Sequence, residues 1–417
     1  MEENTNRKLQ FILGTAGFFF LLIITYYHKQ PPLFDEVLFI PNVYLFEKHG
    51  LTKEFLVNLN NQAPGPLYEF VQLFFKPITG LRAPGIRLVN VFLFGLVILM
   101  IARIFTLVRS ISFFEALTLS LAIVGVPMVW QIAGLALTEM PAMFFCTFSV
   151  MLLIQAIRSE QKPLISTLLA IGAGFCLGLA ILGRSPFLTL VGASLILLFY
   201  KFHSTARWRI ILLFIIVALG VSFPVFYIWG GLVPPQQSFV GKGISIWHGL
   251  LAFAYAGLLT VIISPRWFYL NRSILITLFF TFILMTMVNI FFTHYEYKPF
   301  YKAVATILPQ PLLKHYPFMI SPVLATIALY FMGTCFVHLW QKRHDPIFVF
   351  FLVSGMLLLA SNFKVTHLFS TRYVGQAAAF FVLVAADYDK SRFGRLIRLA
   401  IGMAIGFISL ETYILFG

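Results

Sequence analysis

Apolar runs long enough to cross a membrane follow one another along this chain of 417 residues. A helix needs about 20 mostly apolar residues to cross the hydrocarbon core of a bilayer. The chain is 60% hydrophobic and only 11% charged, whereas soluble domains are about a quarter charged. This pattern excludes an ordinary soluble fold. We therefore expect an all-α polytopic membrane protein made of one transmembrane domain over 1–417.

Thirteen runs have the length and composition of membrane spans. They lie at 11–27, 88–106, 112–128, 140–157, 164–182, 186–200, 210–230, 249–264, 273–292, 318–340, 347–361, 374–386 and 399–416. The runs at 112–128, 186–200 and 374–386 are the weakest. The first run follows Arg7 and Lys8 but has no small-residue cleavage site, so we expect an uncleaved first span rather than a signal peptide.

Basic residues are divided unequally between the two sets of connecting segments. If the N-terminus is cytoplasmic, the inner segments hold 17 Lys and Arg in about 62 residues, and the outer segments hold 13 in about 132. The positive-inside rule therefore predicts a cytoplasmic N-terminus, with all the long loops outside. The formal charge of +15 does not indicate nucleic acid, because the basic residues are scattered singly and in pairs.

The longest polar interval is the first outer loop, 28–87. It holds five of the fifteen acidic residues, namely Asp35, Glu36, Glu47, Glu54 and Glu69. Within it, 34–48 and 66–76 carry apolar residues at helical spacing, yet both are too short and too polar to span. We expect two amphipathic helices lying at the membrane interface. A site built from loops should therefore face outward.

Three carboxylates in the outer segments are candidates for chemistry. Asp35 and Glu36 follow the first span and can present a general base at the membrane surface. The alternative is that Asp35 caps a helix while Glu36 interacts with its dipole, and the residues alone leave both interpretations open. Glu139 lies at the outer mouth of a span, where an ionisable group is costly and often functional, although a first-turn Glu is also ordinary.

Several cations lie outside, against the positive-inside trend: Arg82, Arg87, Arg184, Lys242, Lys364 and Arg372. The turn at 183–185 is so short that Arg184 must lie near the headgroups or point into the bundle. Two guanidinium groups there would form a clamp for a lipid phosphate, and the alternative is snorkelling to headgroups. The histidines and the cysteines Cys146, Cys176 and Cys335 have no metal-ligand spacing, so no metal site is predicted.

The first outer loop resembles that of the GT-C glycosyltransferases, which take sugars from polyprenyl-phosphate donors. The resemblance rests on Phe34-Asp35-Glu36-Val37, Ile40-Pro41-Asn42, Ala63-Pro64-Gly65-Pro66-Leu67-Tyr68 and Ile86-Arg87-Leu88-Val89-Asn90. Within that family these motifs are most similar to the dolichyl-phosphate-glucose alpha-1,2-glucosyltransferase. The segments 138–141 and 370–373 are more similar to bacterial relatives of protein mannosyltransferases and aminoarabinose transferases. Phe39 stands where the glucosyltransferase has His, so donor and acceptor do not transfer from it.

The resemblance implies a GT-C-like bundle of about 13 helices that moves a hexose-type sugar from a polyprenyl-phosphate donor, with inversion, to a lipid-linked glycan, a lipid or a protein. By resemblance, Asp35 is the catalytic base and the outer arginines contact the donor phosphate. We place Glu36 beside the base and expect the acceptor or the base to be supported by Glu139, Tyr68 and Gln62. The expected donor-phosphate contacts are Arg184, Arg372, Arg82, Arg87 and Lys242.

Two other function classes fit the hydropathy. A transporter or flippase of polyprenyl-linked sugars should carry charged or Gly/Pro-broken residues in mid-span, whereas here the charges collect at the outer mouths. A scaffold subunit would not need so polar a first loop. The expected location is a bacterial inner membrane with the site outside, with the endoplasmic reticulum as the alternative. No cofactor is predicted, although a carboxylate beside a phosphate can recruit a divalent metal, and the sugar and the acceptor stay open.

Overall fold

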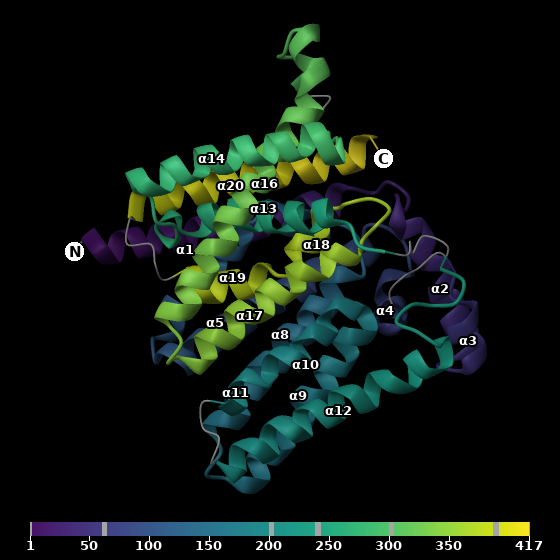
Figure 1. The fold of residues 1–417 in the computed structure, drawn as a ribbon. Coiled ribbons are helices and arrows are strands. Elements are labelled where there is room, and N and C mark those ends of the chain that lie inside the picture. Colours follow the sequence, from purple (N-terminus) through teal and green to yellow (C-terminus); the bar gives the residue numbers. More distant parts are fainter. Residues whose placement is uncertain are drawn as a thin grey trace.

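The computed structural model describes residues 2–60, 65–199, 204–237, 243–299, 304–386 and 392–416, and within these ranges it contains helices and no strands. Long helices lie side by side in a bundle, and three shorter helices from the first outer loop gather at one end of it (Figure 1). We call this the Asp35 end. The protein is therefore all-α, as predicted.

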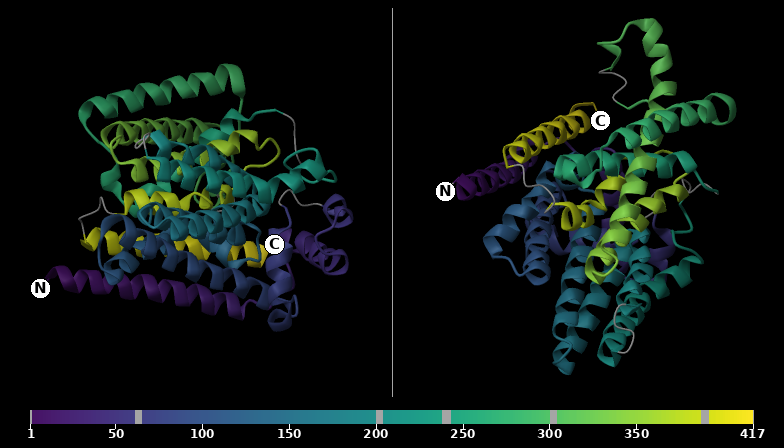
Figure 2. Two further views of the ribbon diagram at one scale, coloured as in Figure 1. Left: turned by 90° about the horizontal axis from the view of Figure 1, so that it is seen from below. Right: turned by 60° about the vertical axis from the view of Figure 1, so that its left-hand side comes forward.

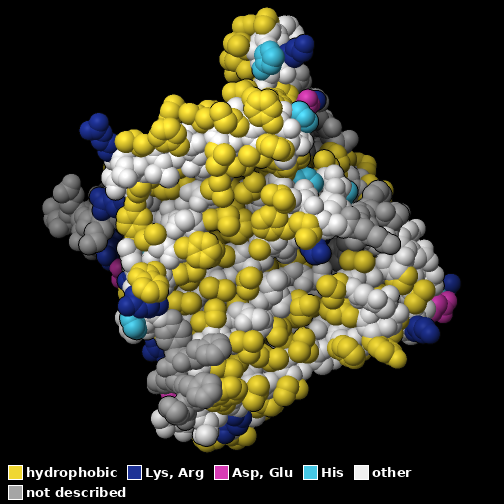
Figure 3. All heavy atoms as spheres, in the orientation of Figure 1, with side chains coloured by type: hydrophobic (Ala, Val, Ile, Leu, Met, Phe, Trp, Pro, Cys, Tyr) yellow, Lys and Arg dark blue, Asp and Glu magenta, His cyan; other side chains and the backbone are white. Residues whose placement is uncertain are grey.

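Ten helices in the described ranges are long and apolar enough to cross a membrane, which makes the chain a multi-pass membrane protein. They are α1 (Glu2–Tyr27), α5 (Gly85–Arg109), α8 (Glu139–Arg158), α9 (Pro163–Gly183), α12 (Thr205–Trp229), α13 (Ile246–Ile263), α14 (Arg272–Val288), α16 (Gln310–Gln341), α17 (Pro346–Ala360) and α20 (Arg392–Phe416). Hydrophobic side chains are spread over the face seen in Figure 3, and most of the Lys and Arg visible there lie at its margins.

The other three predicted spans are not continuous helices. The first is α6 (Phe113–Ser120) with η1 (Leu121–Gly125), then α7 (Pro127–Gly134) after a bend of 86°. The second is η2 (Ser185–Leu188), α10 (Thr189–Ser194) and α11 (Ile196–Phe199), and the third is α18 (Arg372–Gly375) with α19 (Ala378–Ala385). Proline explains the first break, because Pro127 has no N–H to donate and holds Val126 in an extended conformation.

These broken segments still carry the chain from one end of the bundle to the other. Arg184 follows α9 at the Asp35 end, whereas Arg209 near the start of α12 donates to Ser166 near the start of α9, 3.1 Å away. The chain must therefore return between them through η2, α10 and α11. In the same way, Leu383 of α19 accepts a hydrogen bond from Arg109 at the far end of α5. In the described residues, ten of the predicted passes are long helices, and the segments of the other three are built from shorter pieces.

Helix α9 packs closely on α12 because two glycines four residues apart face that helix. A Cβ at Gly174 would lie 2.5 Å from the Phe214 carbonyl oxygen, and one at Gly178 would lie 2.5 Å from Val221 Cβ. Small residues at this spacing let helix backbones approach within a membrane. By contrast, α14 lies at the edge of the bundle against α16 (Figure 2), and none of its residues is buried.

The two short helices predicted in the first loop are present as α2 (Asp35–His49) and α4 (Leu67–Thr79). Helix α2 differs from the amphipathic expectation, since the side chains it buries include Glu36 and Asn42 as well as Phe39 and Val43. A third helix, α3 (Lys53–Asn58), was not predicted.

Candidate active site

Four charged side chains of alternating sign meet at the Asp35 end, each from the end of a different helix. Asp35 begins α2, Arg372 begins α18, Glu139 begins α8, and Arg184 directly follows α9. Arg372 Nη2 lies 2.7 Å from Asp35 Oδ2, and Arg184 Nη2 lies 3.3 Å from Glu139 Oε1. We call these four residues the charged cluster.

The members of the charged cluster differ in their access to solvent. Glu139 is 2% exposed, whereas the Asp35 side chain is 36% exposed and both arginine side chains are 14% exposed. Burial disfavours the charged Arg372 guanidinium, but the carboxylates of Glu139 and Asp35 outweigh it and raise the pKa of Arg372 above its ordinary value. Arg372 therefore stays charged, and Asp35 is the carboxylate that an incoming molecule can reach.

Arg184 retains hydrogen-bonding capacity. Its guanidinium lies over the ring of Tyr373, 5.3 Å from the centroid, which is a cation–π distance. Its buried Nε has no hydrogen-bond partner among the described residues. A buried guanidinium with an unused donor beside a second guanidinium is suited to binding an anion.

Glu36 and Arg87 form a fully buried ion pair, with both side chains 0% exposed. Glu36 accepts from Arg87 Nε and Nη2 at 2.9 and 2.7 Å, and from the backbone N–H groups of Leu33 and Ala136. Arg87 also donates to the carbonyls of His28 and Pro31. The pair therefore joins the segment before α2 to the turn before α8, and in this conformation it is closed to a ligand.

Asn90, one turn after Arg87 on α5, fixes the turn that leads to Glu139. It is 0% exposed, and its Nδ2 donates to the carbonyls of Ile132, Leu135 and Leu137 at 3.3, 2.7 and 2.9 Å. Arg87 and Asn90 thus use one helix to hold the two segments that carry Asp35 and Glu139. This role was not predicted from the sequence, where the only signal was a polar residue three positions after Arg87.

Aromatic side chains hold the segment that carries Arg372. His248 Nδ1 donates to the Val365 carbonyl at 2.6 Å. The ring of Phe369 lies between those of His248, Tyr255 and Tyr297, with centroids 5.9–6.1 Å away. Arg372 Nε then donates to Ser370 Oγ at 3.1 Å. This packing places Arg372 beside Asp35, and neither His248 nor Phe369 could be assigned to it from sequence.

The remaining predicted site residues are separate from the charged cluster or lie outside the described residues. Tyr68 is 0% exposed, and its hydroxyl has no hydrogen-bond partner among the described residues. Burial, with smaller contributions from Glu36 and Glu69, raises the pKa of Tyr68 well above its usual value. Arg82 is exposed. Gln62 and Lys242 lie outside the described residues.

The structure bears on the interpretation of Asp35 as a helix cap. The capping interpretation of Asp35 is not observed, because Phe34 occupies the N-cap of α2 without a side-chain hydrogen bond and the Asp35 carboxylate contacts Arg372. Over the described part of the chain, no group of three or more His, Cys, Asp or Glu side chains is placed to hold a metal ion.

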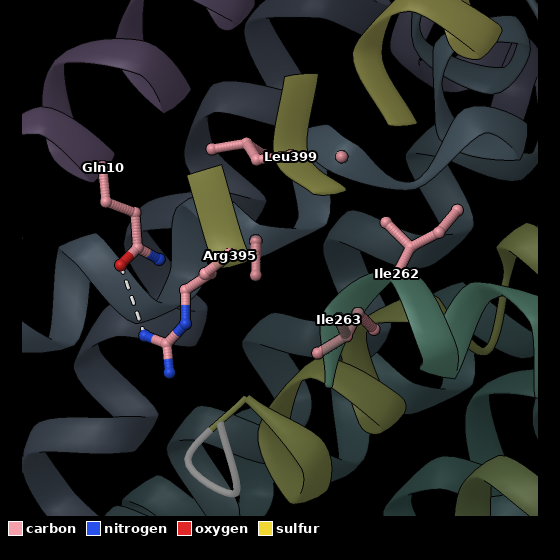
Figure 4. A pocket seen from close by; sticks show the side chains of 7 residues that line it. Gln10, Ile262, Ile263, Arg395 and Leu399 are labelled. Carbon is pink, nitrogen blue, oxygen red and sulfur yellow. Dashed lines mark hydrogen bonds between the residues drawn. The ribbon is translucent and has the colours of Figure 1, made fainter. Parts of the chain in front are cut away.

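The cavity in Figure 4 lies at the opposite end of the bundle, where Gln10 of α1 accepts a hydrogen bond from Arg395 of α20 at 3.2 Å. Its volume of about 10 Å³ holds no more than a water molecule. It is therefore not a substrate site.

Comparison with known proteins finds similarity in solved structures. No protein-family model matches the chain, and no curated protein matches it. The crystal structure of ArnT from Cupriavidus metallidurans bound to undecaprenyl phosphate aligns over 92% of this chain and 77% of that one, with 13% identity and a TM-score of 0.45. The structure of the same protein in the apo state aligns over 96% and 77%, with the same identity and TM-score.

Proposed function

We propose that this protein is an inverting membrane glycosyltransferase of the GT-C type. It moves a sugar from a polyprenyl-phosphate donor to a hydroxyl of a lipid-linked glycan, a lipid or a protein. The observation that carries the proposal is the partly exposed Asp35 carboxylate held beside the guanidinium of Arg372, with Arg184 completing the charged cluster. The loop motifs that resemble the GT-C family support it independently.

The proposed chemistry needs one base and a positively charged site for the leaving group. Asp35 removes the proton from the acceptor hydroxyl. At the same time the hydroxyl oxygen attacks the anomeric carbon from the face opposite the phosphate, so the anomeric centre is inverted. The bond between that carbon and the phosphate oxygen breaks with both electrons going to the phosphate. Arg184 and Arg372 stabilise its increasing charge. Glycosidases need a second carboxyl group as an acid, whereas a phosphate leaves without one.

The other acidic residues take supporting roles in this proposal. Glu139 is buried, contacts Arg184 and attracts Arg372, so in this proposal it holds the two arginines in place rather than acting as the base. The pair of Glu36 and Arg87 fixes the start of α2 and with it the direction of Asp35. Arg87 is therefore omitted from the donor-phosphate contacts, while Arg82 and Lys242 stay as candidates.

The charged cluster favours an enzyme over a transporter of polyprenyl-linked sugars. All four of its members lie at helix ends, whereas a transport pathway carries ionisable residues at mid-span. From the distribution of basic residues, we propose that this end lies outside the cytoplasm. The proposed host membrane is a bacterial inner membrane, with the endoplasmic reticulum as the alternative.

The test is release of polyprenyl phosphate from a panel of polyprenyl-phosphate sugars by purified protein, with acceptor extracts supplied. Asp35→Asn should lower the rate by about 10²–10⁴, the usual contribution of a general base. Asp345→Asn is the matched control, because Asp345 caps α17 at the opposite end and Asn caps equally well. Full activity in Asp35→Asn would refute the assignment and move the base to Glu139. No turnover of any donor by the wild type would favour the transporter.

A further inference from the structure

The guanidinium of Arg372 has two hydrogen-bond partners in the structure. Its Nη2 donates to Asp35 Oδ2 at 2.7 Å, and its Nε is occupied by Ser370 Oγ. Like Arg184, it interacts with Glu139, and in the proposed function both arginines contact the donor phosphate. The guanidinium that would bind the phosphate is therefore already paired with the proposed base.

This pairing conflicts with the role of a base. Arg372 Nη2 occupies Asp35 Oδ2 at 2.7 Å, so this oxygen cannot accept a proton from an acceptor hydroxyl until the contact is released. With no donor bound, Asp35 Oδ2 stays in this contact. A donor phosphate would compete with Asp35 for the same N–H groups.

We propose that Arg372 is a shared counter-ion of Asp35 and the donor phosphate, so that the donor binds first and frees Asp35 for the acceptor. This inference rests on the proposed function. It also balances charge through the reaction. When Asp35 takes the acceptor proton it loses its negative charge, and when the bond to the anomeric carbon breaks the phosphate gains one. In this proposal Arg372 can reach both groups, so it stays paired with one of them while the charge moves.

Three other charged pairs are described near Asp35 and Arg372. Glu36 is bound to Arg87, and His28 Nε2 lies 2.6 Å from Glu411 Oε1. Arg184 contacts Glu139, whose carboxylate also acts on Arg372. Tyr413 near the end of α20 is a further neighbour of Arg372. Among the described ion pairs, Asp35 is joined to Arg372.

Asp35 and the phosphate compete for the guanidinium of Arg372. By thermodynamic linkage, the pairing with Asp35 weakens phosphate binding by the same free energy by which phosphate binding weakens the pairing. If phosphate binding frees Asp35, removing the Asp35 charge must tighten phosphate binding. We expect Asp35→Asn to bind undecaprenyl phosphate roughly 10-fold more tightly than the wild type, which corresponds to one released hydrogen bond between charged groups.

The experiment is a double-mutant cycle on undecaprenyl phosphate affinity in nanodiscs. The gain from Asp35→Asn should disappear in the Arg372→Gln background and persist in the Arg184→Gln background. Simple repulsion between Asp35 and the phosphate would instead give the same gain in both backgrounds, and that result would overturn the inference, as would no gain in the wild-type background.

The affinities also separate failure of this inference from failure of the proposed function. If Asp35→Asn abolishes sugar transfer but leaves phosphate affinity unchanged, Asp35 is still the base and only the shared counter-ion is excluded. If the wild type neither binds undecaprenyl phosphate nor turns over any donor, both proposals fail. Should Arg372→Gln not fold, Arg372→Lys replaces it, because one ammonium cannot reproduce two directed guanidinium contacts, and it should reduce the gain.

Discussion

Replacing Arg87 by Leu tests the buried framework under the charged cluster. The change removes the hydrogen bonds to both Glu36 oxygens and leaves the carboxylate with the backbone N–H groups of Leu33 and Ala136 alone. The carbonyls of His28 and Pro31 also lose their donor. Because both side chains of the pair are 0% exposed, water does not replace what is lost. Breaking such a pair costs about 3–5 kcal/mol.

The matched control is Lys76→Leu, which breaks the ion pair between Lys76 and Glu47. Those side chains are 34% and 41% exposed, so this pair should contribute about 0–1 kcal/mol. At about 2 °C per kcal/mol, the unfolding midpoint should fall by roughly 6–10 °C for Arg87→Leu and by no more than about 2 °C for Lys76→Leu.

Unfolding can be followed by the reaction of the buried cysteines. Its three cysteines, Cys146, Cys176 and Cys335, are all buried, so a thiol-reactive dye should gain fluorescence only as the protein unfolds. Adding Glu36→Leu to Arg87→Leu should recover part of the loss, because the uncompensated charge is removed as well. Equal shifts for Arg87→Leu and Lys76→Leu, or a double variant as unstable as the sum of the two single ones, would refute the reasoning.

Two further predictions concern residues around the cluster. A Cβ at Gly65 would lie 2.4 Å from the carbonyl oxygen of Leu182, so Gly65→Ala should displace the turn that carries Arg184 and weaken undecaprenyl phosphate binding. Gly220→Ala is the control, because a Cβ added at Gly220 would meet no neighbouring atom within 4 Å. Equal affinities of the two variants for undecaprenyl phosphate would count against the prediction. Tyr68→Phe removes a buried hydroxyl that makes no described hydrogen bond. The variant should turn over the donor within about threefold of the wild type, and its free energy of unfolding should rise by up to about 1 kcal/mol. A tenfold loss of turnover would instead indicate that Tyr68 contacts the acceptor.

The fold was largely predictable because membrane spans are a local property. Hydropathy identified the passes, and the three weakest are the ones that the structure builds from bent or short helices. The bend at Pro127 was not predicted, since a proline at a span end is compatible with both a continuous and a broken pass. Helix α2 was predicted to be amphipathic and instead buries Glu36, because the partner that neutralises it comes from α5.

The candidate site was only partly predictable. Asp35, Glu139, Arg184 and Arg372 were selected one by one as charges in unfavourable places, and the structure brings them together. Arg87 was selected on the same grounds but lies in a buried pair with Glu36. The sequence could not distinguish Arg184 and Arg372 from Arg87, because an arginine has the same neighbouring residues in the sequence whether its side chain is exposed or paired in the interior.

The sequence by itself determined that this chain crosses a membrane repeatedly and where most passes begin and end, because each pass must satisfy its own backbone in lipid. Which charges meet was decided only by the tertiary structure. Asp35 and Arg372 are 337 residues apart, and their contact depends on α5 holding one segment through Arg87 and Asn90 while Phe369 and His248 hold the other. Burial and partner choice are properties of the packed bundle, and no single stretch of sequence contains them.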